Sequence, residues 1–201
     1  MKNLLWKCVE LVINYYQGFI MTWFVYRFLN PKSLKQAKTF LSIFSIIFGT
    51  TITLLNHITL YEGFTSTLYL VILLVYAIIA FNDSIIKKLL STIIPNIILL
   101  LITSVELNLL SSLNRISVKH LITNDNSVRF MTLLVIQISL WISLKIIIKL
   151  FKFSDSYTIS DWSPIITVLI SSFILVSLLH VLSLNADDTQ RIYINLSYLV
   201  I

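Results

Sequence analysis

The side chains most able to do chemistry are a few polar residues inside, or at the ends of, long apolar stretches. Glu106 is the only acidic residue well inside a predicted helix, and a carboxyl group inside a membrane helix is usually functional. Asn56, His57 and Glu62 lie around the end of an earlier stretch, and His180 lies near the end of a later one. These five side chains are the candidate ligand-binding residues. The alternative, that each simply reaches water at a helix end, stays open.

Catalytic and metal sites find little support in the sequence. No histidine and carboxylate pair has the spacing of a known zinc motif, and the single cysteine, Cys8, excludes a disulfide or thiolate cluster within one chain. A nucleophilic cysteine also needs a lowered thiol pKa, for which the neighbouring Lys7 is weak support. Glycine-rich phosphate loops, GxSxG and HExxH are absent. We therefore predict no catalytic residue, no metal and no cofactor in this chain.

Pro95 and Asn96 form a second feature inside the same apolar stretch as Glu106. Proline removes one helical hydrogen bond and crowds the preceding turn, which predicts a kink. The amide of Asn96 is expected to bond either to freed carbonyl groups or to a neighbouring helix. A role in packing alone is an equally good interpretation.

The composition indicates that membrane helices must position these residues. Of 201 residues, 57% are hydrophobic and only 12% are charged, whereas soluble domains carry about 25% charged residues. Apolar stretches of about 17–25 residues have the length of a transmembrane helix. Uncharged stretches span residues 11–26, 39–61, 63–82, 89–105, 130–144 and 162–186.

The expected fold is all-α: a polytopic integral membrane bundle with six complete transmembrane helices and the start of a seventh. We place the helices near residues 8–28, 39–60, 64–82, 89–113, 130–150 and 164–184, with the seventh from about 192. No Gly/Ser-rich or Pro-rich linker divides the chain, so residues 1–201 are expected to form one sensor-like domain. Residues 192–201 cover only about 15 Å of a core roughly 30 Å thick, so we expect the chain to continue.

Basic residues predict a cell-membrane protein with its N-terminus outside. Cytoplasmic loops carry an excess of Lys and Arg. With this orientation, nine of the 15 basic residues face the cytoplasm and six face the exterior, and the loop from Arg27 to Lys38 contributes most. The net charge of +6 is therefore assigned to topology, and no nucleic-acid partner is expected.

Several short segments follow one another in an informative order. They are residues 17–19 (QGF), 24–29 (FVYRFL), 55–63 (from Leu-Asn to Glu-Gly), 85–90 (IIKKLL), 93–96 (IIPN), Arg129 and 160–162 (SDW). In this order they resemble the N-terminal membrane region of GHKL-type sensor histidine kinases, the relatives of the accessory-gene-regulator peptide receptor. The resemblance covers nearly the whole chain.

This resemblance implies a signal-sensing input domain of a two-component system, homodimeric in the lipid bilayer and responsive to an extracellular signal such as a small peptide. It also implies that the kinase domain is absent from this chain, because neither a phosphoacceptor helix nor an ATP-binding box is present. His57, His120 and His180 are expected at outer helix ends or in an outer loop. None of them is therefore assigned as the phosphoacceptor.

Two other interpretations remain open. One is a stand-alone small membrane protein, such as a transporter subunit or an accessory factor, although three glycines are few for the broken helices of a transporter. The other is a membrane peptidase that matures a peptide signal, which would depend on Cys8.

Overall fold

The computed structural model describes residues 2–56, 62–114 and 127–150, together with residues 118, 121, 167, 171, 174, 175 and 178. Within these residues the chain forms five α-helices, and it has no β-strand beyond one isolated bridge. The helices are α1 (Lys2–Phe28), α2 (Leu34–Leu55), α3 (Glu62–Ala80), α4 (Ile85–Asn114) and α6 (Ser127–Leu150).

The expected number of membrane helices is wrong. Three of the described helices are long and apolar enough to cross a membrane, over Leu34–Leu55, Ile85–Ser111 and Ser127–Lys149. Six complete spans and the start of a seventh are therefore not supported. The sequence around 164–184 and 192–201 lies largely outside the described residues. The three apolar spans nevertheless make this chain a membrane protein in contact with the lipid bilayer.

The two other helices, α1 and α3, do not qualify as membrane spans, and the reasons differ. In α1, the polar residues Glu10, Asn14 and Gln17 interrupt the apolar sequence. In α3, the apolar part is Thr65–Ala80, which covers roughly 24 Å at 1.5 Å per residue, less than a hydrocarbon core of about 30 Å. Length alone therefore overestimated the number of membrane spans.

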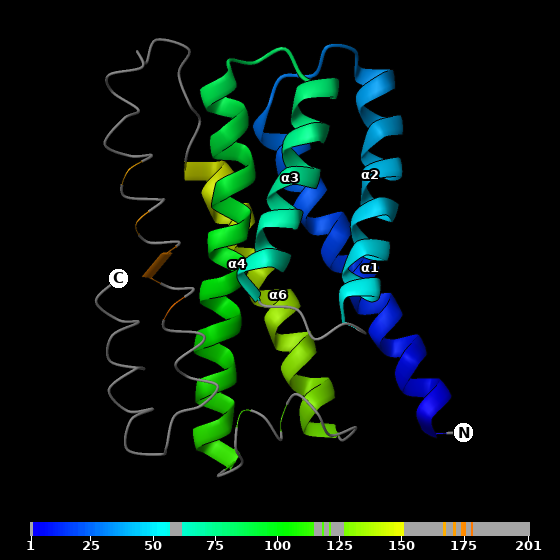
Figure 1. Cartoon of the computed structure of the whole chain (residues 1–201), viewed down its shortest axis with the longest axis vertical. Helices are drawn as coiled ribbons and strands as arrows, with labels where there is room; N and C mark the ends of the chain where they lie inside the picture. The colour runs from blue at the N-terminus through cyan, green and yellow to red at the C-terminus, as the bar shows by residue number, and fades with distance from the viewer. Residues whose placement is uncertain are drawn as a thin grey trace.

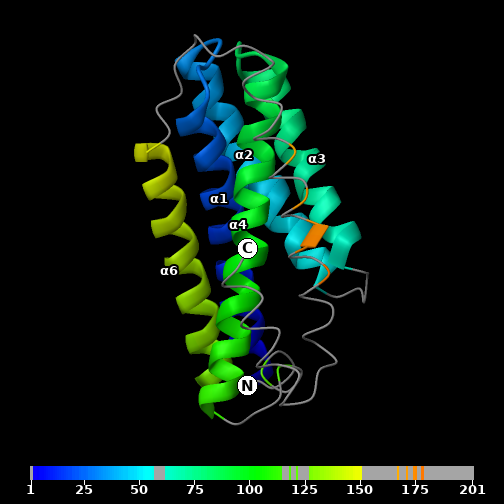
Figure 2. The same cartoon turned by 90° about the vertical axis from the view of Figure 1, so that its left-hand side faces the viewer.

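The helices form a bundle with α1 at its centre, since α1 contacts each of the other four helices. The most extensive packing is between α1 and the antiparallel α2. By contrast, α6 runs parallel to α1, and Figure 2 shows α3 and α6 on opposite sides of the pair formed by α1 and α4. A central helix with four neighbours can present residues on every side of its axis.

Small residues let α1 and α2 approach closely. A Cβ atom added at Gly18 would lie 2.8 Å from the backbone nitrogen of Gly49 and 2.8 Å from the carbonyl oxygen of Ser45. The hydroxyl oxygens of Thr22 and Ser45 are 2.6 Å apart across the same contact. Glycine, serine and threonine are the residues that favour close helix packing in membranes.

Two loops close one end of the bundle. The backbone N–H of Asn30 donates to Asp83 Oδ2 (2.5 Å), and the Asn30 amide donates to Asp83 Oδ1 (3.1 Å). Pro31 and Phe81 form the antiparallel bridge between the two loops. The proline also ends α1, because the residue before a proline disfavours the helical conformation. We call this the basic end, since its charged residues are mainly Arg27, Lys32, Lys35, Lys38, Lys87 and Lys88.

The two halves of the bundle interior differ in chemistry. Toward the basic end, aromatic rings fill the core: Tyr76 contacts Phe44 in a tilted arrangement (5.1 Å between ring centroids) and Phe81 edge-to-face (5.2 Å). The opposite end contains the start of α1, the end of α4 and the start of α6, as Figure 1 shows. We call it the cavity end, because its interior is hollow and polar.

Candidate functional site

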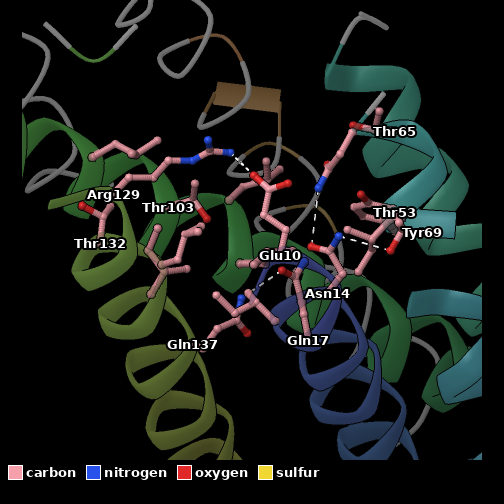
Figure 3. Close-up of a pocket in the computed structure, with 18 of the residues that line it drawn as sticks. Glu10, Asn14, Gln17, Thr53, Thr65, Tyr69, Thr103, Arg129, Thr132 and Gln137 are labelled. Carbon is pink, nitrogen blue, oxygen red and sulfur yellow. Dashed lines mark hydrogen bonds and ion pairs between the residues drawn. The ribbon is translucent and has the colours of Figure 1, made fainter. Parts of the chain in front are cut away.

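A cavity of about 890 Å³ lies in the cavity end of the bundle, and side chains from all five described helices line it. Most of its polar lining residues carry amides or hydroxyls, and its charged residues are Lys7, Glu10 and Arg129. Figure 3 shows these side chains converging from α1, α6 and the helices opposite. Polar groups inside a membrane bundle are costly unless they face one another or a water-filled space.

One polar stripe on α1 forms a wall of the cavity. Lys7, Glu10, Asn14 and Gln17 follow one another at spacings of three, four and three residues, and all four line the cavity. With 3.6 residues per turn, this spacing places them on one helix face. The sequence analysis missed the stripe because it searched for carboxylates and histidines at helix ends. The spacing itself was a signal that could have revealed it.

An ion pair joins α1 to α6 beside the cavity. The Arg129 guanidinium contacts the Glu10 carboxylate, and both side chains are partly buried. Arg129 also lies 5.7 Å from the ring centroid of Trp6, a cation–π contact. Arg129 was expected only as part of a family resemblance, so its pairing with Glu10 was not predicted.

Deeper in the bundle, a pair of glutamines forms a second bridge between α1 and α6. The Gln137 amide nitrogen donates to Gln17 Oε1 at 3.0 Å. Gln137 is only 4% exposed, and its own amide oxygen is buried with no hydrogen-bond partner among the described residues. A buried acceptor without a donor costs about 1–3 kcal/mol. Because Gln137 lines the cavity, a ligand donor that reached this oxygen would remove that cost.

Asn14 connects the stripe to α2. Its amide nitrogen donates to Thr53 Oγ1 at 3.2 Å, and its amide oxygen accepts from the Asn56 amide at 3.4 Å. Asn14 is buried, whereas Asn56 is exposed and ends α2. Of the two candidate ligand-binding residues whose side chains the structure describes, Asn56 and Glu106, Asn56 lines the cavity.

Of the other candidates, Glu106 is the one whose side chain the structure describes, and it does not lie in the cavity with Asn56. Glu106 lies on α4 outside the cavity lining, and Ser139 of α6 lies near its carboxyl group. Glu62 begins α3, but its side chain is outside the description, and His57 and His180 lie outside the described residues. A site built on all five residues therefore stays a prediction.

The proline of α4 lies beside the cavity. Pro95 is buried within the uninterrupted helix α4. Asn96 is 1% exposed and lines the cavity, while its amide nitrogen donates to the Thr92 carbonyl oxygen of its own helix at 2.8 Å. The amide thus binds the backbone one turn earlier rather than a neighbouring helix, and its remaining polar surface borders the cavity.

The arrangement is suited to hydrogen bonding with a bound molecule. Amide side chains both donate and accept hydrogen bonds, whereas catalysis needs a nucleophile or an acid–base group within reach of the substrate. Cys8 is exposed and is not a lining residue. Within the described part of the chain, no group of three His, Cys, Asp or Glu residues could hold a metal ion.

No protein-family model, curated protein or solved structure matches this chain.

Proposed function

We propose that this chain is a membrane-embedded binding domain that senses a small polar molecule in its central cavity. The observation that carries the proposal is the polar cavity of about 890 Å³, since ligand sites typically measure about 300–1,000 Å³. Its walls combine amides of α1 and α6 with apolar side chains such as Leu99 and Ile136. Such a mixture fixes the orientation of a ligand and also buries its apolar surface.

The proposed orientation places the cavity end outside the cell. Basic residues dominate the opposite end of the bundle, where Asp83 is the acidic residue of the loops that join α1 to α2 and α3 to α4. Because basic loops favour the cytoplasmic side, the start of α1 would face the exterior. A signal molecule would then reach the cavity from outside without crossing the membrane.

A role as the input domain of a sensor histidine kinase is the finer form of this proposal. It is supported by the sequence resemblance described above, from which the homodimer and the response to a peptide are also inferred. In this form, ligand binding between α1 and α6 would change their packing and pass to a cytoplasmic kinase domain.

A transporter subunit is the second candidate function, and Pro95 is the observation that favours it. Transporters commonly bind substrates near the bilayer middle, beside helices interrupted by proline or glycine. Asn96 lines the cavity, and Pro95 precedes it within α4. Purified chain in proteoliposomes would discriminate the two functions, because only a transporter would accumulate a bound solute inside the vesicles.

Thiol labelling tests whether the cavity is an accessible binding site. We would replace Thr132, a 3% exposed lining residue, by cysteine in a Cys8→Ala background. In lipid nanodiscs, this thiol should react with a small water-soluble methanethiosulfonate. At least one solute from a panel of amino acids, organic acids, sugars and nucleosides should slow the reaction.

Ser45→Cys is the matched control, because Ser45 is 8% exposed but lies in the contact between α1 and α2, away from the cavity. Its thiol should react at least about tenfold more slowly. If the two thiols react equally slowly, or if no solute protects Thr132→Cys, the proposal is wrong.

A further inference from the structure

We infer that the cavity selects an elongated molecule with an anionic group at one end and a hydrogen-bond donor about 10 Å away. This inference rests on the proposed binding function and specifies the chemical class of the ligand. It combines three observations on α1 and α6: the charge beside the Glu10–Arg129 pair, the unpartnered oxygen of Gln137, and the spacing between them.

The charge of the cavity lining favours the anionic group of the ligand. Among the described residues, those that line the cavity and carry charge are Lys7 and Arg129, with two positive charges, and Glu10, with one negative charge. The local excess of one positive charge favours an anionic ligand. The Arg129 guanidinium, which pairs with Glu10, places a positive charge at the cavity wall where a ligand carboxylate would be attracted. The exposed ammonium of Lys7 can approach the same carboxylate.

The buried amide of Gln137 selects the second group. Its nitrogen is already used on Gln17, and its oxygen still needs a donor. A ligand ammonium, hydroxyl or amide N–H would satisfy this oxygen, whereas an ether or a methyl group would not. Sites that offer a buried polar group discriminate strongly against ligands that leave it unpaired.

The helix register sets the distance between the two groups. Glu10 and Gln17 are seven residues apart on α1, and their partners Arg129 and Gln137 are eight residues apart on the parallel α6. At 1.5 Å per residue, the two bridges are separated by about 10–12 Å along the bundle. Apolar side chains such as Leu133 and Ile136 lie between them on α6. An apolar spacer therefore suits the middle of the ligand.

A series of linear ω-amino carboxylic acids tests the inference on the full chain in lipid nanodiscs. Extended 8-aminooctanoic acid separates its carboxylate and ammonium groups by roughly 10 Å, so it should bind more tightly than 4-aminobutanoic acid in calorimetric titrations. Two analogues complete the series. The primary amide of 8-aminooctanoic acid lacks the anion, and 8-methoxyoctanoic acid lacks the donor. Each should bind at least about tenfold more weakly.

Variants assign each half of the ligand to its residue. Arg129→Gln and the milder Lys7→Gln should reduce the preference for the acid over the amide, whereas Arg27→Gln at the basic end should not. Gln137→Leu should reduce the preference for the amino over the methoxy compound, whereas the exposed Gln36→Leu should not. Thermal unfolding without ligand would identify any variant that fails to fold, and Lys7→Gln changes only an exposed side chain.

Equal binding of the acid, the amide and the methoxy compound would overturn the inference, as would the absence of binding by the whole series. In both cases the proposed binding function is judged separately by the Thr132→Cys labelling, which uses a chemically broad panel. Protection by sugars or nucleosides alone would therefore reject the anionic, elongated ligand and still support a binding cavity.

Discussion

Replacing Gly18 by alanine should destabilise the bundle, because α1 and α2 touch at this residue. The added Cβ atom would lie 2.8 Å from the backbone nitrogen of Gly49 and 2.8 Å from the carbonyl oxygen of Ser45. Non-bonded heavy atoms are most stable at about 3.5–4.0 Å. Since both opposing atoms belong to the backbone, the two helices must move apart by roughly half an ångström or more.

The change in the free energy of unfolding caused by Gly18→Ala combines two opposing effects. Overpacking of this kind typically costs about 1–3 kcal/mol, and separation also stretches the bridges across the contact, from Thr22 to Ser45 and from Asn14 to Thr53. Such hydrogen bonds contribute about 0.6 kcal/mol each in membrane proteins. Alanine offsets part of the loss, because it favours the helix over glycine by about 1 kcal/mol. We expect a net loss of about 1–2 kcal/mol in the free energy of unfolding.

Equilibrium unfolding of the purified chain in mixed micelles, followed by circular dichroism, would measure this loss. Ser42→Ala is the control on α2, because Ser42 is exposed and surface substitutions usually change stability by less than about 0.5 kcal/mol. The double variant with Gly49→Ala should cost less than the sum of the two single variants, since both glycines serve one contact. If Gly18→Ala is as stable as the unchanged chain, the close approach of α1 and α2 described above is wrong.

Two further predictions concern the basic end and the orientation. Asp83→Ala should lower the free energy of unfolding by about 1–3 kcal/mol, because the nearly buried carboxylate accepts two hydrogen bonds from Asn30 that would be lost. Unfolding in mixed micelles at a fixed detergent ratio measures this change, and an unchanged unfolding midpoint would contradict it. In a Cys8→Ala background, a cysteine at Ser127 should react with an impermeant reagent on intact cells and a cysteine at Ser33 should not, and the reverse pattern would place the cavity end in the cytoplasm.

The apolar stretches were enough to predict an all-helical membrane chain, but they did not predict how many helices could cross. The stretch 11–26 is uncharged and close to the length of a transmembrane helix, yet Asn14 and Gln17 make one face of its helix polar. That face is satisfied inside a bundle, where α6 and α2 supply partners. The length of an apolar stretch indicates whether its helix can span a membrane. The positions of amide side chains around the helix decide which neighbouring helices it contacts.

The cavity itself could be predicted only in part. The stripe on α1 has a helical period that can be read from one segment. Gln137 and Asn96, in contrast, are isolated polar residues in apolar helices, and nothing in their own segments shows which neighbour they face. Their positions depend on how α4 and α6 rotate against α1. The search for Glu and His at helix ends also gave charge more weight than amides, and amides make most of the contacts in this site.

The bridge between the two loops at the basic end acts as a pivot for the bundle. There, Pro31 and Phe81 tie the junction of α1 and α2 to the junction of α3 and α4. Glu10 lies about 27 Å along α1 from Phe28, the last residue of the helix, so a sideways shift of 1 Å at Glu10 tilts the helix by only about two degrees. The bridge holds the α1–α2 junction against the α3–α4 junction. Such a tilt would therefore reach the basic end as a small rotation of both junctions together.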